Sequence, residues 1–97
     1  MEIKTTAVAG TLESSDIQIM ISKGSNGIEI DLDSEVKKAY GDQINGVIES
    51  TLKDFGLTDA KVKAVDKGAL DCVIKARTLA AAQRATETTD QPALEVL

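Results

Sequence analysis

The chain has 97 residues and a formal net charge of -5 at pH 7, and it contains no histidine and one cysteine. Its only aromatic residues are Tyr40 and Phe55. This composition argues against binding to nucleic acids or anionic membranes, because such binding depends on an excess of Lys and Arg. Without histidine, Ser-His-Asp and Cys-His catalysis are excluded, and so is a zinc site of the usual kind.

The length allows one domain with one modest hydrophobic core. A lone cysteine cannot form an internal disulfide, which suits a reducing compartment. No apolar run approaches the roughly 18 residues of a membrane-spanning helix, and the N-terminus lacks the basic-then-apolar pattern of a secretory signal. The sequence therefore predicts a soluble cytoplasmic protein.

Three strands are predicted in the first third of the chain. Residues 3–9 are rich in Thr and Val, and residues 16–22 and 27–33 alternate between apolar and polar side chains. The predicted inward-facing side chains are Ile17, Ile19, Ile21, Ile28, Ile30 and Leu32. Asn26 and Gly27 adopt tight turns at low cost, so we expect residues 16–22 and 27–33 to pair as a hairpin.

The period then changes to three and four residues, which predicts a long helix from Val36 to Phe55, with Ser34 as its N-cap and Gly56 as its end. The predicted apolar stripe of this helix is Val36, Tyr40, Ile44, Val47, Ile48, Leu52 and Phe55. Residues 60–66 alternate again and predict a fourth strand. A second helix is predicted to run to about Ala85, with the apolar stripe Ala69, Cys72, Val73, Ala76, Leu79 and Ala80.

This order of elements predicts an α+β fold: a small two-layer sandwich with a mostly antiparallel sheet of about four strands and two helices on one face. Residues 1–85 are predicted to form the domain, and residues 86–97 a flexible C-terminal tail. Asp66 is a candidate cap of the second helix, and Cys72 is predicted to be a buried small hydrophobe on its apolar stripe.

The polar stretch from Gly10 to Asp16 interrupts two apolar runs and is the candidate functional site. It places the hydroxyls of Ser14 and Ser15 beside the carboxylates of Glu13 and Asp16. Two interpretations are open: a turn stabilised by its own side chains, or an anchor that a partner enzyme modifies. No base stands nearby to activate a serine, and no metal-ligand pattern occurs, so we expect neither a catalytic residue nor a metal site.

Two longer motifs carry a resemblance to a known family. Residues 7–16 (AVAGTLESSD) and residues 66–77 (DKGALDCVIKAR) closely resemble the acyl carrier, or gamma, subunit of bacterial citrate lyase. The likeness covers roughly residues 1–85, including the total length and the order of elements. Ordinary phosphopantetheine carriers are helical bundles, and the strand-rich pattern seen here argues against that group.

The resemblance implies a carrier without catalytic activity of its own. In the family, the serine matching Ser14 is joined by a phosphodiester to 2'-(5''-phosphoribosyl)-3'-dephospho-CoA, which a separate transferase, the holo-carrier synthase, installs. The group carries acetyl and citryl thioesters, and the alpha and beta subunits use them to cleave citrate to acetate and oxaloacetate. The choice of Ser14 over Ser15 comes from the match to the motif.

Two alternatives stay open. The carrier subunit of malonate decarboxylase uses the same kind of prosthetic group, although the motif at residues 66–77 favours citrate lyase. An unmodified interaction or assembly domain belongs to a different class, and in such a protein Ser14 would be only a turn residue. A stand-alone enzyme is the least favoured option.

Overall fold

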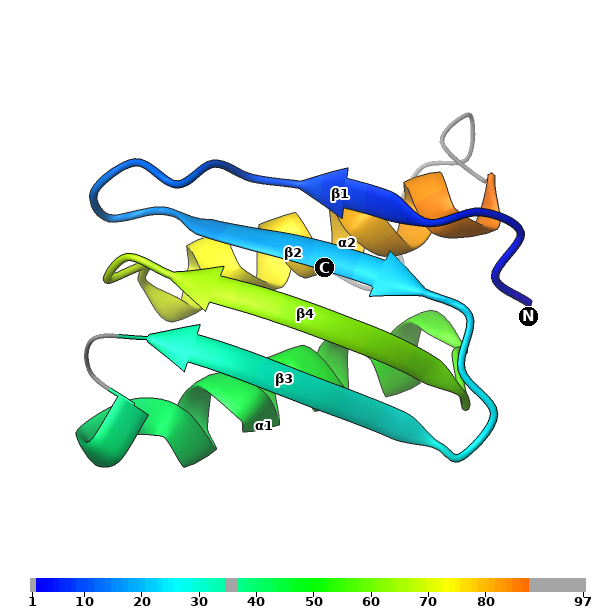
Figure 1. Ribbon diagram of the computed structural model, residues 1–97, viewed down its shortest axis with the longest axis horizontal. Coiled ribbons are helices and arrows are strands. Elements are labelled where there is room, and N and C mark those ends of the chain that lie inside the picture. The colour runs from blue at the N-terminus through cyan, green and yellow to red at the C-terminus, as the bar shows by residue number, and fades with distance from the viewer. Residues whose placement is uncertain (1, 35–36, 88–97) are drawn as a thin grey trace.

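A four-stranded sheet backed by two helices forms the protein, whose computed structural model describes residues 2–34 and 37–87. The elements in chain order are β1 (Ala7–Ala9), β2 (Ile17–Ser22), β3 (Ile28–Ser34), α1 (Lys37–Phe55), β4 (Ala60–Asp66) and α2 (Asp71–Thr86). The strands lie in the order β1-β2-β4-β3, and both helices cover the same face of the sheet (Figure 1). The β1–β2 and β2–β4 pairs are antiparallel and the β3–β4 pair is parallel. The predicted two-layer α+β sandwich is confirmed.

The hydrophobic core lies between the sheet and the helices. The strongest contribution comes from β2, whose Ile17, Ile19 and Ile21 are fully buried, and burying each of these side chains contributes roughly 1.5–3 kcal/mol. Alternate residues of β3 and β4 are also buried or half-buried, while the charged residues between them are exposed. The alternation read from the sequence therefore separates a helix-covered face of the sheet from an open one.

The predicted hairpin between the second and third strands is wrong, because β4 lies between β2 and β3. The connection from β2 to β3 instead crosses the start of β4 (Figure 1). There Gly24 packs so closely on Ala60 that a Cβ on this glycine would lie 2.8 Å from the Ala60 carbonyl carbon. Gly27 accepts a hydrogen bond from the Ala60 N–H at 3.0 Å and donates one to the Asp59 carboxylate at 2.7 Å. The small, turn-forming residues of this segment thus allow the chain to cross the start of β4 between β2 and β3.

Strand β1 is shorter than the predicted residues 3–9 and spans only Ala7–Ala9. The backbone N–H groups of Lys4 and Thr5 donate to the carbonyl of Ala85, at 2.8 and 3.1 Å. Because those donors are used at the end of α2, the segment before β1 follows the helix instead of extending the sheet.

Helix α1 ends as predicted at Phe55, and Gly56 terminates it with a φ of 104°. The Gly56 N–H donates to the Lys53 carbonyl and the Leu57 N–H to the Leu52 carbonyl, each at 3.0 Å. This pair of bonds is the Schellman pattern that glycine favours. At the other end, the predicted Val36 start lies outside the described residues.

Tyr40 was predicted to lie on the apolar stripe of α1, but its side chain is 56% exposed. Ile44, Ile48 and Leu52 on the same stripe are buried. Tyr40 lies in the first turn of α1, which starts at the end of the molecule where β3 finishes (Figure 1), and its exposure shows that neighbouring elements do not cover the ring. The periodicity therefore identified the helix correctly and overestimated the length of its buried face.

The buried face of α2 also differs from the predicted stripe. Cys72, predicted to be buried, is exposed, and so is Ala76. The residues of α2 that face the core are Ile74, Thr78, Leu79, Ala81, Ala82, Ala85 and Thr86. Because the helix is rich in alanine, two rotations of it give apolar stripes of similar strength, and packing against β1 and β2 selects the one that contains Ile74. Among the described residues, no helix combines the length and apolar character needed to cross a bilayer.

Candidate functional site

The predicted site forms the loop between β1 and β2, at the end of the sheet where β4 finishes (Figure 1). Its tip is a turn in which the Asp16 N–H donates to the Glu13 carbonyl at 3.2 Å. Ser14 and Ser15 occupy the centre of this turn, and Ser15 has a φ of 66° in the left-handed region. The loop therefore presents both serines at its outermost point.

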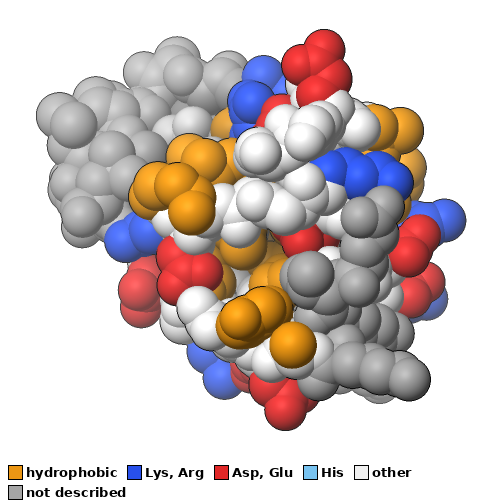
Figure 2. All heavy atoms as spheres, turned by 90° about the vertical axis from the view of Figure 1, so that its left-hand side faces the viewer, with side chains coloured by type: hydrophobic (Ala, Val, Ile, Leu, Met, Phe, Trp, Pro, Cys, Tyr) orange, Lys and Arg blue, Asp and Glu red, His pale blue; other side chains and the backbone are white. Residues whose placement is uncertain are grey.

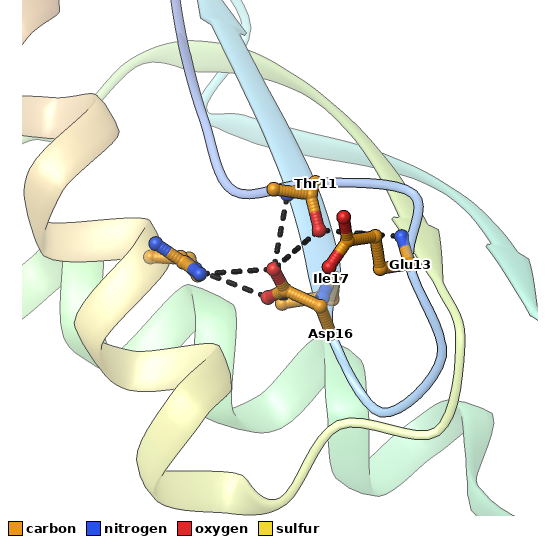
Figure 3. Close-up of polar contacts among 5 residues, drawn as sticks. Thr11, Glu13, Asp16 and Ile17 are labelled. Carbon is orange, nitrogen blue, oxygen red and sulfur yellow. Dashed lines mark hydrogen bonds and ion pairs between the residues drawn. The ribbon is translucent and has the colours of Figure 1, made fainter.

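Asp16 fixes the shape of this loop (Figure 3). Its carboxylate accepts hydrogen bonds from the Thr11 hydroxyl at 2.6 Å, the Thr11 N–H at 3.2 Å and the Ile17 N–H at 2.7 Å. Arg77 of α2 completes the arrangement with a bidentate ion pair, Nε to Oδ1 at 3.0 Å and Nη2 to Oδ2 at 2.9 Å. Bidentate Arg–carboxylate pairs combine strength with a defined orientation. One carboxylate thus ties both ends of the loop to a helix.

A second set of contacts joins the loop to the segment after β4. The Ser15 N–H donates to the Lys67 carbonyl at 2.8 Å, and the Lys67 N–H donates to the Asp16 carbonyl at 2.9 Å. The two motifs that carried the family resemblance, residues 7–16 and 66–77, are therefore one structural unit. The backbone pair with Lys67 holds the tip of the loop, and the ion pair with Arg77 holds its base.

Ser14 itself stands free of these contacts. Its side chain is exposed, and its hydroxyl makes no hydrogen bond with any residue that the structure describes. Its neighbours on both sides are fixed, whereas the hydroxyl faces solvent. This arrangement leaves the oxygen accessible to another protein and gives it no group that would activate it.

The contacts of Asp16 lower the pKa of its carboxyl well below the usual value of 3.8, mainly through the hydrogen bond from Arg77 and then those from Thr11 and Ile17. A carboxyl whose pKa is lower in the folded state stabilises the fold above its unfolded-state pKa, and this stabilisation is lost as the pH falls. We therefore expect the stability difference between wild type and Asp16→Asn to stay constant from pH 7 to about 5 and to shrink below the unfolded-state pKa. Urea unfolding at a series of pH values measures it, and a difference independent of pH down to 3 would contradict the assignment.

Arg77 and Lys67 are the site residues that sequence reasoning did not single out. Both belong to the 66–77 motif, but their partners lie about 50 to 60 positions earlier in the chain. The available signal in the sequence was an arginine in one motif and an aspartate in the other, which together could form an ion pair.

Asp66 lies close to the site but does not cap α2 as predicted. The N-cap is Leu70, and no side chain caps it. The buried Asp66 carboxylate instead accepts hydrogen bonds from the Ala69 N–H at 3.0 Å and the Ser34 hydroxyl at 2.9 Å, which hold the turn between β4 and α2. Among residues 2–34 and 37–87, no group of three or more Cys, Asp or Glu is arranged to hold a metal ion.

Comparison with known proteins places this geometry in a family. A family profile described as "Malonate decarboxylase delta subunit (MdcD)", of the acyl carrier type, matches residues 4–85. The citrate lyase acyl carrier protein of Lactobacillus helveticus is 86% identical over 97 residues, which cover 100% of both chains. The chain belongs to the citrate lyase acyl carrier protein family. The proteins of the same name from Lactobacillus acidophilus and Lactiplantibacillus plantarum are 81% and 69% identical, again over the whole of each chain.

A solved structure shares the fold of this citrate lyase carrier family. A chain of the Pseudomonas malonate decarboxylase hetero-tetramer, crystallised with malonate, superposes with a TM-score of 0.74 over 88% of each chain at 16% identity. At that identity the likeness establishes the fold alone. The resemblance read from the two motifs is confirmed by the full-length relatives, and membership makes the chain an acyl carrier and not itself a catalyst.

Proposed function

We propose that the chain is the acyl carrier subunit of a citrate lyase complex and that Ser14 is joined by a phosphodiester to 2'-(5''-phosphoribosyl)-3'-dephospho-CoA. Once attached, this group supplies a terminal thiol that holds acetyl and citryl groups as thioesters. The alpha and beta subunits cleave citrate to acetate and oxaloacetate, and this chain brings the acyl group to them. The family membership supports the carrier role.

The observation that supports an attachment site here is the exposed hydroxyl of Ser14, without a hydrogen bond, on a loop fixed on both sides. The Ser15 hydroxyl is exposed as well, so the match to the motif selects Ser14. An anchor of this kind needs access for a partner enzyme and a defined position on the carrier. A long flexible arm attached to a fixed point keeps its acyl group at high effective concentration near two active sites. Asp16 and Arg77 supply the fixed point, and Ser14 supplies the oxygen.

The charges around Ser14 fit a phosphodiester. Asp16, two residues away, is neutralised by its ion pair with Arg77, so its repulsion of a phosphate is reduced. Lys67 is bonded to the loop through its backbone, and its exposed side chain adds a positive charge beside the loop. Glu13, which directly precedes Ser14, is exposed and carries a negative charge that the Lys67 ammonium group offsets. The charge around the attachment site is therefore close to balanced, although the chain has a net charge of -5.

The attachment reaction is a phosphoryl-type transfer that the holo-carrier synthase performs. The Ser14 Oγ forms a bond to the 5''-phosphorus of a donor in which that phosphate is activated as a phosphoanhydride. The anhydride P–O bond breaks, and the phosphate on the far side of that bond leaves while the 5''-phosphate stays on Ser14. The hydroxyl proton passes to a base of the transferase. The carrier needs no base of its own, in agreement with the lack of histidine.

A malonate decarboxylase carrier is the second candidate, and the description of the family profile and the fold of the Pseudomonas chain favour it. The full-length identity of 86% to a citrate lyase carrier outweighs the 16% identity to that chain. An unmodified interaction domain is the remaining alternative, and it predicts that Ser14 has no special role.

Intact mass of the protein purified from its native host, followed by peptide mapping across residues 5–23, tests the proposal. We expect a mass increment equal to the phosphoribosyl dephospho-CoA group, located on Ser14 and fully absent from Ser14→Ala. Ser15→Ala is the matched control, since it removes the neighbouring hydroxyl, and it should retain the group. An unmodified chain from cells that ferment citrate would overturn the carrier proposal, and modification that survives in Ser14→Ala would overturn the site.

A further inference from the structure

The open face of the sheet carries a hollow that begins at the Ser14 loop. Both helices lie on the other face, so side chains of β2 and β4 on this side meet solvent (Figure 1). The hollow, called here the sheet-face hollow, is lined by Leu12, Gln18, Met20, Lys63, Val65 and Lys67. Leu12 belongs to the loop itself, two residues before Ser14, so the anchor and the hollow are continuous.

Apolar and cationic groups alternate in the sheet-face hollow. Leu12 and Met20 are 55% and 38% exposed, and both line this one hollow. Lys63 and Lys67 are exposed beside them, and neither ammonium group forms an ion pair with any residue the structure describes. A surface that combines apolar patches with two free positive charges suits a ligand with both an aromatic ring and phosphates.

Three carboxylates border this surface. Glu13 lies in the loop, and Asp31 and Asp33 are the register neighbours of Lys63 and Val65 on β3. None of the three is within ion-pair distance of Lys63 or Lys67. The two ammonium groups are therefore free to bind an anion, at a strength that salt will reduce because all of these groups are exposed.

A second hollow at the same end of the molecule has different chemistry. It lies between the starts of α1 and α2 and includes Tyr40, Gln43, Leu70 and Asp71. Its exposed apolar groups contribute to the hydrophobic side chains visible on this end of the molecule (Figure 2). Among the residues that the structure describes, its only charged lining residue is Asp71, which accepts hydrogen bonds from the Gln43 amide at 3.0 and 3.2 Å. The described lining of this second hollow offers no cationic side chain to a diphosphate, whereas the sheet-face hollow offers Lys63 and Lys67.

We propose that the sheet-face hollow binds the adenosine and diphosphate part of the prosthetic group, with Lys63 and Lys67 on the phosphates and Leu12, Met20 and Val65 against the adenine. This inference rests on the proposed attachment at Ser14. The adenosine and the diphosphate are the parts of the group nearest the phosphoribosyl link. They are therefore the parts that a surface beginning at Leu12 reaches first.

The size of the hollow limits what it holds. Its volume is about 260 Å³, below the roughly 300–1,000 Å³ of sites that enclose a drug-sized ligand. It therefore accommodates part of the group and leaves the pantetheine arm and its thiol outside. Binding near the anchor shortens the freely moving portion of the arm and directs it along one face of the carrier, while tethering makes even weak contacts effective.

Nuclear magnetic resonance of the apo and holo forms tests this inference without measuring enzyme activity. The holo form is purified after its mass shows the group on Ser14, and methyl signals of Leu12, Met20 and Val65 are compared with those of the apo form. We expect shifts at these methyls and at the diphosphate phosphorus, which decrease as salt is raised. In Lys63→Gln/Lys67→Gln holo protein, the ratio of bound to free adenosine should fall about tenfold, from loss of two exposed charge contacts.

Lys61→Gln is the matched control, because Lys61 lies on the same strand and face as Lys63 but at the far end of β4, opposite Ser22. It should leave the shifts unchanged. If the chemical shifts that differ between apo and holo protein are confined to residues next to Ser14, or fall on Tyr40 and Leu70, the inference is overturned while the attachment stands. A protein that carries no group on Ser14 overturns the attachment and the inference together. The variants alter exposed side chains, and apo spectra that superpose away from residues 63 and 67 verify their folds.

Discussion

Gly10→Ala is expected to lower the free energy of unfolding by about 3 kcal/mol or more, a large part of the roughly 5–15 kcal/mol that stabilises a typical domain. Gly10 has a φ of 91°, which a residue with a Cβ adopts only at a cost. A Cβ at this position would also clash with the carbonyl oxygen of Ile17 and lie 2.9 Å from its carbonyl carbon. Because Ile17 begins β2 and its N–H is bonded to Asp16, the clash displaces the base of the Ser14 loop.

Gly27→Ala separates the two causes of this effect. Gly27 has a φ of 78°, but a Cβ there would meet nothing within 4 Å. It should therefore lose about 1 kcal/mol from the backbone conformation alone. Urea unfolding of both variants gives the comparison, and amide exchange of Ser15 reports on the loop. Equal losses in the two variants would show that the contact with Ile17 has no energetic importance.

The elements of the fold followed from local patterns, and the order of the strands did not. The alternation of Ile17, Ile19 and Ile21 and the apolar spacing around Ile48 predicted β2 and α1 closely. The same local patterns predicted a β2–β3 hairpin, although β4 inserts between these strands. A turn at Asn26 and Gly27 serves equally well in a hairpin and in a connection that crosses another strand. The choice depends on Ala60 and Asp59, which lie more than 30 residues further along.

Helix rotation was the second feature that local patterns left undecided. Alanine contributes little apolar contrast, so the sequence of α2 is compatible with burial of either Cys72 or Ile74. Packing on the sheet favours burial of Ile74, because a branched side chain gains more from burial than a thiol on the opposite side of the helix. In α1, Tyr40 fits the spacing but lies where the neighbouring elements no longer cover the helix.

At the candidate site, the sequence located the loop and the resemblance chose Ser14, but neither indicated what holds the loop in place. The hydrogen bonds of Asp16 to Thr11 and Ile17 join residues that are close in the sequence, and they are consistent with the polar composition of the stretch. The ion pair with Arg77 joins residues 61 positions apart, so it depends on the docking of α2 against β1 and β2. The position of Ser14 is thus a property of the tertiary structure.

Asp16→Ala is expected to lower the free energy of unfolding by about 3 kcal/mol, because it removes the acceptor of the Thr11, Ile17 and Arg77 hydrogen bonds. A hydrogen bond to a charged group contributes roughly 1.5–3 kcal/mol net, and contributions to one shared carboxylate do not add in full. Arg77→Met keeps the aliphatic stem of the arginine and removes only the ion pair. In a double-mutant cycle we expect a coupling energy between Asp16 and Arg77 of about 1–2 kcal/mol, since the Asp16 side chain is only 13% exposed although Arg77 is 41% exposed. Urea unfolding of the four proteins at pH 7 measures it.

The exposed pair Glu49–Lys53 on α1, with an N–O distance of 2.8 Å, is the matched control. It should give a coupling of only about 0.3–0.5 kcal/mol, as is usual for exposed pairs one helical turn apart. Amide exchange of Ser15 distinguishes a local from a global role: it should accelerate in Arg77→Met more than the change in global stability requires. A coupling energy for Asp16–Arg77 no larger than that of Glu49–Lys53 would contradict this role of the ion pair. The backbone hydrogen bonds with Lys67 would then be sufficient to hold Ser14 in place. The ion pair would be a consequence of the loop conformation and not its cause.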